Sequence, residues 1–285
     1  MSAISFAMAV RLKLCSLRGP IFNSRSFIEI SQCIQQGRTF KTSWVELKPN
    51  HDSTPLDISS NLRSSHITNV FQKLLLTAGS AYMCLAHAAT RPDMIAVFGE
   101  TTGHVALKSM HMKMKADEEG SQILRDQPRI NSGTVDLESL GRMPAGTLGR
   151  IYSDFLNDHK ITPDSRRTVQ FVDDPELAYV MQRYREVHDL VHTILGMPIN
   201  MLGEVSVKWI EGIQTGLPMC VVGGVFGPLQ LSRKQRKKYL SHYLPWAIQT
   251  GFEAKFLMNV YYEKRWEQPM EEILNELNIK PLIVP

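Results

Sequence analysis

Two histidines, an aspartate and a glutamate interrupt an otherwise apolar stretch of the chain, HDLVHTILGMPINMLGE at residues 188–204. Imidazole and carboxylate groups are costly to bury unless something pairs with them. His188 and His192 are four residues apart, a spacing that places both side chains on one face of a helix. A divalent cation would satisfy such buried donors together, because both side-chain types are common metal ligands. The stretch therefore predicts a metal site.

The predicted ligand set contains two nitrogens and two oxygens. His188, Asp189 and His192 have the spacing of the H-E-x-x-H zinc motif, with aspartate in place of glutamate. The Gly-Met-Pro sequence that follows is expected to reverse the chain, so that Glu204 returns to the same place from a second helix. Zinc, iron(II) and manganese all suit this helix-turn-helix clamp. The four cysteines show no C-x-x-C spacing, so a cysteine metal site is not expected.

The residues before this turn have the pattern of a long helix. Asp173 or Asp174 is expected to cap it, Pro175 to occupy its first turn and Gly196 to end it. The two histidines fall within a stripe of apolar residues at helical spacing. That stripe consists of Leu177, Val180, Met181, Tyr184, Val187, Val191 and Leu195. Both imidazoles are therefore predicted to face the protein core.

Further helices are expected after the turn. The next begins with Pro198 near its first turn and ends at Gly212 or Gly216. A glycine-broken apolar segment follows at 217–229, and Ser232 and the Gln268-Pro269 junction then signal the starts of later helices. No alternating pattern indicates a sheet, and no internal repeat is present. The sequence thus predicts an all-α fold, a single helical domain at 66–285.

The N-terminus has a different composition. Residues 1–28 contain Arg11, Lys13, Arg18 and Arg25, several serines and no acidic residue, which is typical of a mitochondrial transit peptide. We expect a cleaved transit peptide at 1–40 and a polar linker at 41–65.

Two features concern membranes and charged partners. The nearly charge-free run at 74–89 is shorter than the ~20 apolar residues that span a bilayer, so we expect it to be buried in protein. The basic run RKQRKK at 233–238 is expected to contact anionic lipid headgroups. Nucleic acid is not an expected partner, because no aromatic stacking residues are interleaved with these charges.

The stretch RYREVHDLVHTILGMPINMLGEVSVKWIE closely resembles the H-D-x-x-H-x(11)-E signature of the mitochondrial ubiquinone biosynthesis protein Coq-four family. His188, Asp189, His192 and Glu204 all match that signature. Segments 143–156 and 171–189 and the C-terminal WEQPMEEI are also similar to the family, so that the likeness covers about residues 65–285.

This resemblance implies an all-helical protein on the matrix side of the mitochondrial inner membrane and peripheral to it. It implies zinc held by the four matching residues, and other coenzyme Q biosynthesis proteins as partners in a multisubunit complex. The implied substrate is a 4-hydroxy-3-methoxy-5-polyprenylbenzoate, which loses its ring carboxylate with or without hydroxylation at that carbon. As a proton must then reach the ring, Asp189 and Glu204 are the candidate catalytic residues.

Three other functions are considered. A zinc-dependent hydrolase is disfavoured, because aspartate is one methylene too short to act as the general base of H-E-x-x-H sites. An HD-type phosphohydrolase requires a later aspartate, and none follows Asp189. A non-catalytic lipid-binding scaffold stays open, with the apolar segments 67–89 and 246–262 available to hold an isoprenoid tail.

Overall fold

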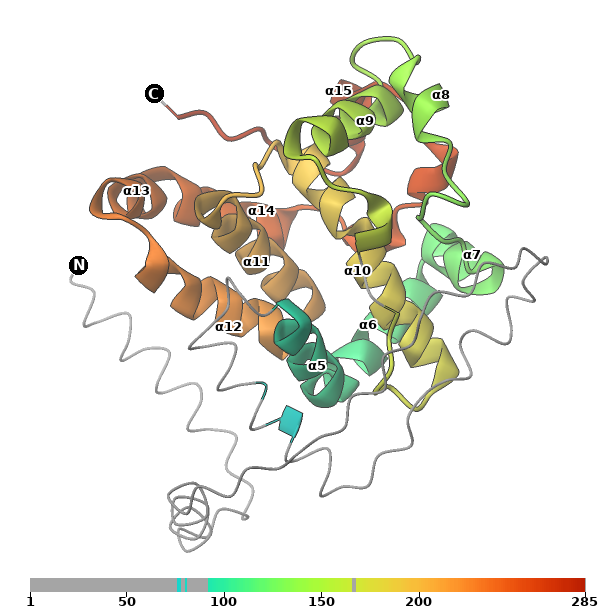
Figure 1. The fold of residues 1–285 in the computed structure, drawn as a ribbon, viewed down its shortest axis with the longest axis horizontal. Coiled ribbons are helices and arrows are strands. Elements are labelled where there is room, and N and C mark those ends of the chain that lie inside the picture. The colour runs from blue at the N-terminus through green and yellow to red at the C-terminus, as the bar shows by residue number, and fades with distance from the viewer. Residues whose placement is uncertain (1–75, 78–79, 81–91, 166–167, 285) are drawn as a thin grey trace, which may run out of the picture. The chain divides into compact units, whose positions relative to one another are not determined.

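The computed structural model describes residues 76–77, 80, 92–165 and 168–284, with the backbone alone for 92–96. Within these ranges the regular elements are helical, and the one isolated β-bridge joins Thr147 to Pro269. The predicted all-α class is confirmed (Figure 1). The expected transit peptide, the linker and most of the apolar segment 67–89 lie outside the described residues.

Helices of 5 to 21 residues follow one another along the described part of the chain. The α-helices are α5 (Pro92–Thr102), α6 (His104–Ala116), α7 (Glu118–Asp126), α8 (Leu137–Gly141), α9 (Leu148–His159), α10 (Pro175–Leu195), α11 (Met201–Thr215), α12 (Pro218–Phe226), α13 (Arg233–Lys238), α14 (Leu244–Glu253) and α15 (Met270–Glu276). The 3-10 turns are Pro163–Ser165, Gly227–Gln230, Leu257–Asn259 and Tyr262–Lys264, and a π-helical turn covers Tyr239–Tyr243.

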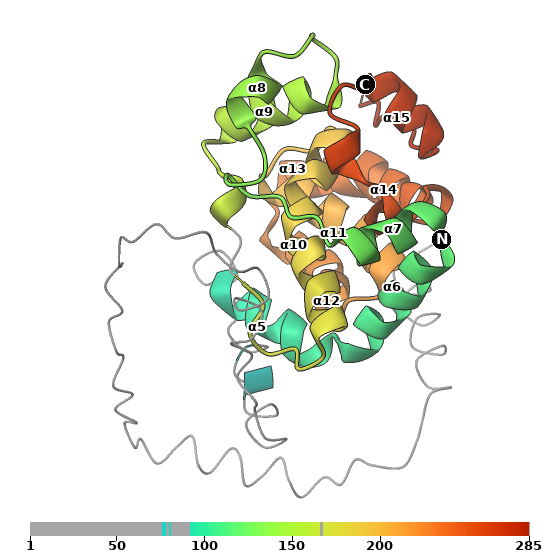
Figure 2. The ribbon, with the colours of Figure 1, turned by 90° about the vertical axis from the view of Figure 1, so that its right-hand side faces the viewer.

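Helix α10 forms the centre of the helical domain. In Figures 1 and 2, α8, α9 and α15 lie toward one end of it and α5 and α6 toward the other. Helices α6, α9 and α11 pack directly against α10, while α12 and α14 pack on α11. The main apolar core surrounds α10 and draws on residues from α6 through α15.

The bounds predicted for α10 are confirmed. Asp174 is the N-cap, and its carboxylate accepts hydrogen bonds from the backbone N–H groups of Glu176 and Leu177 at 2.9 and 3.2 Å. Gly196 ends the helix in the left-handed conformation with φ 62°. The single apolar stripe was too narrow an expectation, because every residue from 177 to 195 is buried. Helices pack around α10 on several sides, so it has no solvent-facing stripe.

Helix α11 starts later than the sequence suggested. Asn200 is its N-cap, and Pro198 lies before the helix. The chain uses the residues after the left-handed Gly196 to complete its turn before α11 begins. The predicted end at Gly216 is confirmed, where φ is 72°.

The apolar segment 217–229 is mostly helical rather than broken by its glycines. A Cβ on Gly224 would lie 3.2 Å from the Trp209 ring of α11, so this glycine allows the two helices to approach closely. In contrast, the apolar segment 246–262 is not one helix, because α14 ends at Glu253 and two 3-10 turns follow.

The later start signals are confirmed. Ser232 forms a capping box with Gln235 at the start of α13, and α15 begins directly after Pro269. Among the described residues, none of the helices combines the length and apolar character needed to cross a bilayer.

Candidate metal centre

The polar side chains of α10 meet partners from distant parts of the chain. Burial removes water from these groups, so each charge requires compensation within the protein. Arg183 is paired with Glu263, Arg185 with Glu100 and Glu186 with Arg129. His188 and His192 lie one and two helical turns after Tyr184 on the same buried helix.

A tight turn brings α11 against the C-terminal end of α10. The Met197 N–H donates to the carbonyl of His192 at 2.9 Å, and Asn200 then caps α11. A Cβ on Gly203 would lie 1.9 Å from the carbonyl oxygen of Pro198, so only glycine fits this close approach. Glu204 follows at once, in the first turn of α11. The turn thereby determines which α11 side chain faces the histidines.

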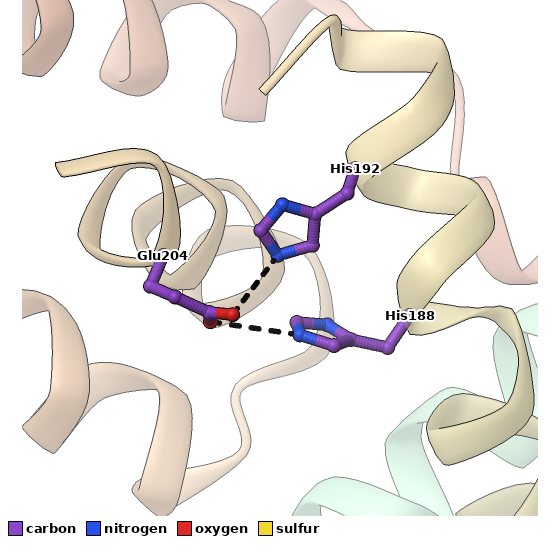
Figure 3. A group of neighbouring side chains, drawn as sticks. All are labelled: His188, His192 and Glu204. Atoms are coloured by element: carbon purple, nitrogen blue, oxygen red, sulfur yellow. Dashed lines mark ion pairs between the residues drawn. The ribbon is translucent and has the colours of Figure 1, made fainter. Parts of the chain in front are cut away.

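Three of the four predicted ligands converge. His188 Nε2 lies 3.6 Å from Glu204 Oε2, and His192 Nε2 lies 3.5 Å from Glu204 Oε1. Figure 3 shows both imidazoles extending from α10 toward the Glu204 carboxylate on α11. The ligand atoms of the three residues lie within 4.8 Å of one another, and they are the one group of this kind in the described part of the chain.

The outer nitrogens of the two imidazoles are already engaged. His188 Nδ1 lies 2.6 Å from a carboxylate oxygen of Glu211, and His192 Nδ1 lies 3.0 Å from the carbonyl oxygen of Met197. Both of these oxygens can only accept, so each Nδ1 carries the proton. The Nε2 lone pairs of neutral imidazoles then point toward the Glu204 carboxylate, and the three electron-rich groups require a cation among them.

The geometry and burial fit a divalent ion. Two ligands that each lie ~2.0–2.1 Å from a tetrahedral zinc ion are roughly 3.3 Å apart, close to both histidine–glutamate distances. His192 Nε2 is buried and has no hydrogen-bond partner, which is rare for a buried polar atom. The described residues could therefore hold a metal ion here through two nitrogens and a carboxylate.

The same contacts shift ionisation in the metal-free protein. Burial alone would lower the pKa of His188, but the Glu211 carboxylate and Glu204 raise it above its ordinary value. Burial alone would raise the pKa of Glu204, yet the neighbouring imidazoles of His188 and His192 bring it well below its ordinary value. When no metal is bound, a proton on His188 thus balances the Glu204 carboxylate, while Lys208 is paired with Glu211.

One predicted ligand lies apart from this group, and one residue that was not predicted contacts it. Asp189 is almost fully buried, and its carboxylate is not among the atoms that converge on Glu204. Glu211, which the sequence reasoning missed as a site residue, contacts His188 directly. The spacing of the two glutamates could have revealed it. Glu211 follows Glu204 by seven residues, so both lie on the same face of α11.

Comparison with known proteins identifies the family of the chain. Residues 63–282 match the family described as coenzyme Q (ubiquinone) biosynthesis protein Coq4. The chain belongs to this family. Its role therefore lies in ubiquinone biosynthesis.

Relatives agree with this assignment, and a solved structure shares the fold. The chain is 59% identical over 216 residues to the mitochondrial ubiquinone biosynthesis protein COQ4 homolog of Bombyx mori, covering 76% of this chain and 83% of that protein. It is 54% identical to the Xenopus laevis homolog, covering 88% and 91%. A crystal structure of a putative ubiquinone biosynthesis protein from Nostoc punctiforme has the same fold, with a TM-score of 0.57 at 20% identity over 73% of this chain and 97% of that one.

The paired charges at the site predict a pH window in the metal-free protein. The stabilisation from protonated His188 is present below the unfolded histidine pKa of about 6.5 and is lost as the pH rises through the raised folded value. The contribution of Glu204 is present above an unfolded pKa of about 4.3 and is lost as the pH falls through the lowered folded value. The stability difference between wild type and His188→Asn should thus be largest between about pH 5 and 6.

Urea unfolding in the presence of a chelator, repeated across this pH range, measures that difference. The control is His111→Asn, since His111 is paired with a largely exposed Glu176 carboxylate. A wild-type advantage over His188→Asn that keeps growing toward pH 9 would contradict the charge assignment.

Proposed function

We propose that the chain catalyses a metal-dependent step of ubiquinone biosynthesis, the removal of the C1 carboxyl group from a 4-hydroxy-3-methoxy-5-polyprenylbenzoate. It would then be a carbon-carbon lyase. Family membership supports the pathway, and the resemblance to the family, rather than the chemistry of the site, selects the substrate. The observation that carries the metal chemistry is the buried, unpartnered His192 Nε2 beside His188 and Glu204.

The proposed ligands are His188, His192 and Glu204, with Asp189 as the fourth. Zn²⁺ is the proposed ion, and iron(II) or manganese suits the same nitrogen and oxygen donors. The convergence of three ligand atoms supports the first three assignments. Asp189 is assigned from its place in the signature, next to His188 on the same buried helix.

The bound ion would supply positive charge that binds and polarises the anionic oxygen substituents of the ring. Cleavage of the carbon-carbon bond releases carbon dioxide and leaves an electron pair on the ring carbon, so a proton must reach that carbon. Glu204 is placed to relay such a proton from the substrate phenol, because its side chain is 34% exposed whereas that of His192 is fully buried. Asp189, deeper in the protein, is the second candidate for this role.

Loss of the carboxyl group with hydroxylation of the same carbon is the oxidative form of the proposal. It would require dioxygen as the oxidant, and zinc itself does not change oxidation state. Mass analysis of the product distinguishes a ring hydrogen at C1 from a ring hydroxyl.

The metal site makes a direct prediction. Purified wild-type protein should carry about one divalent ion per chain, and His188→Ala or His192→Ala should reduce this to about a tenth or less, because a buried ligand is lost. Elemental analysis of protein prepared without chelators measures the content. His111→Ala, which removes a histidine outside the site, should keep its metal. Unchanged metal in both site variants would rule out the site.

The chemical step is tested in cells and with purified protein. Cells lacking the protein should be short of ubiquinone and should recover it with the wild-type gene but not with Asp189→Ala or Glu204→Ala. Wild-type protein incubated with the prenylated hydroxybenzoate should release carbon dioxide, and these variants should lose most of that activity because proton relay or metal binding fails. Full rescue by both variants would instead favour a non-catalytic scaffold that organises the coenzyme Q biosynthesis proteins.

We further propose that the protein lies on the matrix side of the mitochondrial inner membrane. The names of its relatives support a mitochondrial location, and one of its surfaces supports contact with lipid. Residues 212–252 contain no acidic residue and include the basic helix α13. Large apolar side chains are exposed on α12 and in the segments that flank α13 in the sequence, namely Val221, Val225, Phe226, Leu229 and Leu240. Cations beside exposed apolar groups suit an anionic lipid surface. We call this the α12–α13 surface.

Charge removal from this surface should weaken membrane binding. Each basic residue near an anionic membrane contributes about 1 kcal/mol, so replacing Lys234, Lys237 and Lys238 with glutamine should lower affinity by about a hundredfold. Flotation with cardiolipin-containing vesicles, compared with phosphatidylcholine vesicles, measures the change. A control with the same charge change replaces three exposed lysines elsewhere: Lys108, Lys115 and Lys160. Equal losses in both variants would place the contact on another surface.

A further inference from the structure

We infer that Glu211 is a positioning residue of the metal centre, which holds the His188 ring so that its Nε2 faces the ion. The inference rests on the proposed metal site and adds a residue outside its ligand set. Glu211 lies on α11 and is nearly fully buried, and its Oε1 lies 2.6 Å from His188 Nδ1.

The two oxygens of Glu211 have separate partners. Oε1 accepts from the His188 ring, whereas Oε2 accepts from the Tyr184 hydroxyl and from the Lys208 ammonium, each at 2.7 Å. Lys208 also reaches the Tyr184 hydroxyl at 3.2 Å. With both oxygens engaged, the carboxylate has little freedom to turn, and its contact with His188 is fixed in direction.

These partners come from both helices of the clamp. Tyr184 lies one turn before His188 on α10, and Lys208 lies one turn before Glu211 on α11. The network therefore ties the two helices together directly behind the ligand atoms. A carboxylate on the outer nitrogen of a metal-binding imidazole fixes its tautomer and ring orientation, and also makes it a stronger ligand.

The negative charges of Glu204 and Glu211 explain why Glu211 forms an ion pair with Lys208. A lone buried carboxylate would be costly, and a second negative charge beside Glu204 would add to that cost. Lys208 balances Glu211, so the negative charge left facing the ion comes from Glu204. His192 has no such carboxylate, because its Nδ1 is held by the carbonyl of Met197. The two histidines are thus held differently, and Glu211 acts on His188 alone.

A purely structural ion pair is the competing explanation, and Glu186 provides the matched control. Glu186 is a buried carboxylate on α10 that accepts from Arg129 at 2.6 Å and from Gln182, and it is not part of the metal-binding group. Substitution there removes an equally buried ion pair. It should destabilise the fold without changing how His188 is held.

The test compares Glu211→Leu and Glu211→Gln with Glu186→Leu and Glu186→Gln in the full chain. Zinc affinity is measured by competition with a chromogenic chelator, and the visible spectrum of cobalt(II)-substituted protein reports the ligand geometry. We expect Glu211→Leu to weaken zinc binding 10- to 100-fold and to alter the cobalt spectrum. Glu211→Gln, which keeps a neutral acceptor for Nδ1, should lose less. Both Glu186 variants should match wild type in affinity and spectrum.

The outcomes separate the two proposals. Wild-type protein that binds no zinc overturns the metal site and this inference together. Tight zinc binding by wild type with unchanged affinity and spectrum in Glu211→Gln and Glu211→Leu overturns the role of Glu211 alone. If Glu211→Leu fails to fold, Glu211→Gln decides by the same comparison with Glu186→Gln.

Discussion

The site depends on the burial of α10 on every side. A helix with a solvent-facing stripe could turn its polar groups into water, whereas α10 must satisfy each of them within the protein. For the two histidines, protein oxygens at Nδ1 fix the protons on the outer side of each ring. The inner nitrogens then share a space of a few ångströms with the Glu204 carboxylate, and only a proton or a metal ion can make that arrangement favourable.

Three buried ion pairs act together to hold α10 in register. Glu100, Arg129 and Glu263 come from three separate segments and each pairs with a different α10 side chain. Removing one partner of a buried pair typically costs about 3–5 kcal/mol, so a shift of α10 by even one turn would break several pairs at once. The three contacts therefore fix the register of α10, while the tight turn at Gly203 fixes the place of Glu204.

The parts of the site that depend on local sequence were predictable. Caps, left-handed glycines and the spacing of His188 and His192 act within a few residues, so the helix bounds of α10 and the return of Glu204 follow from the chain itself. The Glu211 contact depends on how α11 crosses α10, which local patterns do not encode. The same holds for Gly224, which reads as a helix breaker in sequence but permits close packing in the fold.

The expectation of a single apolar stripe on α10 was wrong for a related reason. A periodicity argument counts apolar side chains, and it assigns residues such as Arg183 and Glu186 to a solvent face. Their partners lie 57 to 80 residues away in sequence, so charge pairing made the polar face of α10 as buried as its apolar one. The position of Asp189 is set by the same packing, and the signature alone does not determine it.

The part of α11 that carries Glu204 packs next to the end of α12. Glu204 is the most exposed of the three converging side chains, and its neighbour Val205 packs against Gly227, directly after α12. Phe226 and Leu229, on either side of that contact, are exposed. A substrate with a long isoprenoid tail resides in the bilayer, because exposing its many apolar carbons to water is costly. In the proposed arrangement, with the α12–α13 surface on the membrane, the ring of such a substrate would reach Glu204 from the lipid. Glu204 would then be the ligand that the substrate can touch, because both histidine side chains are buried.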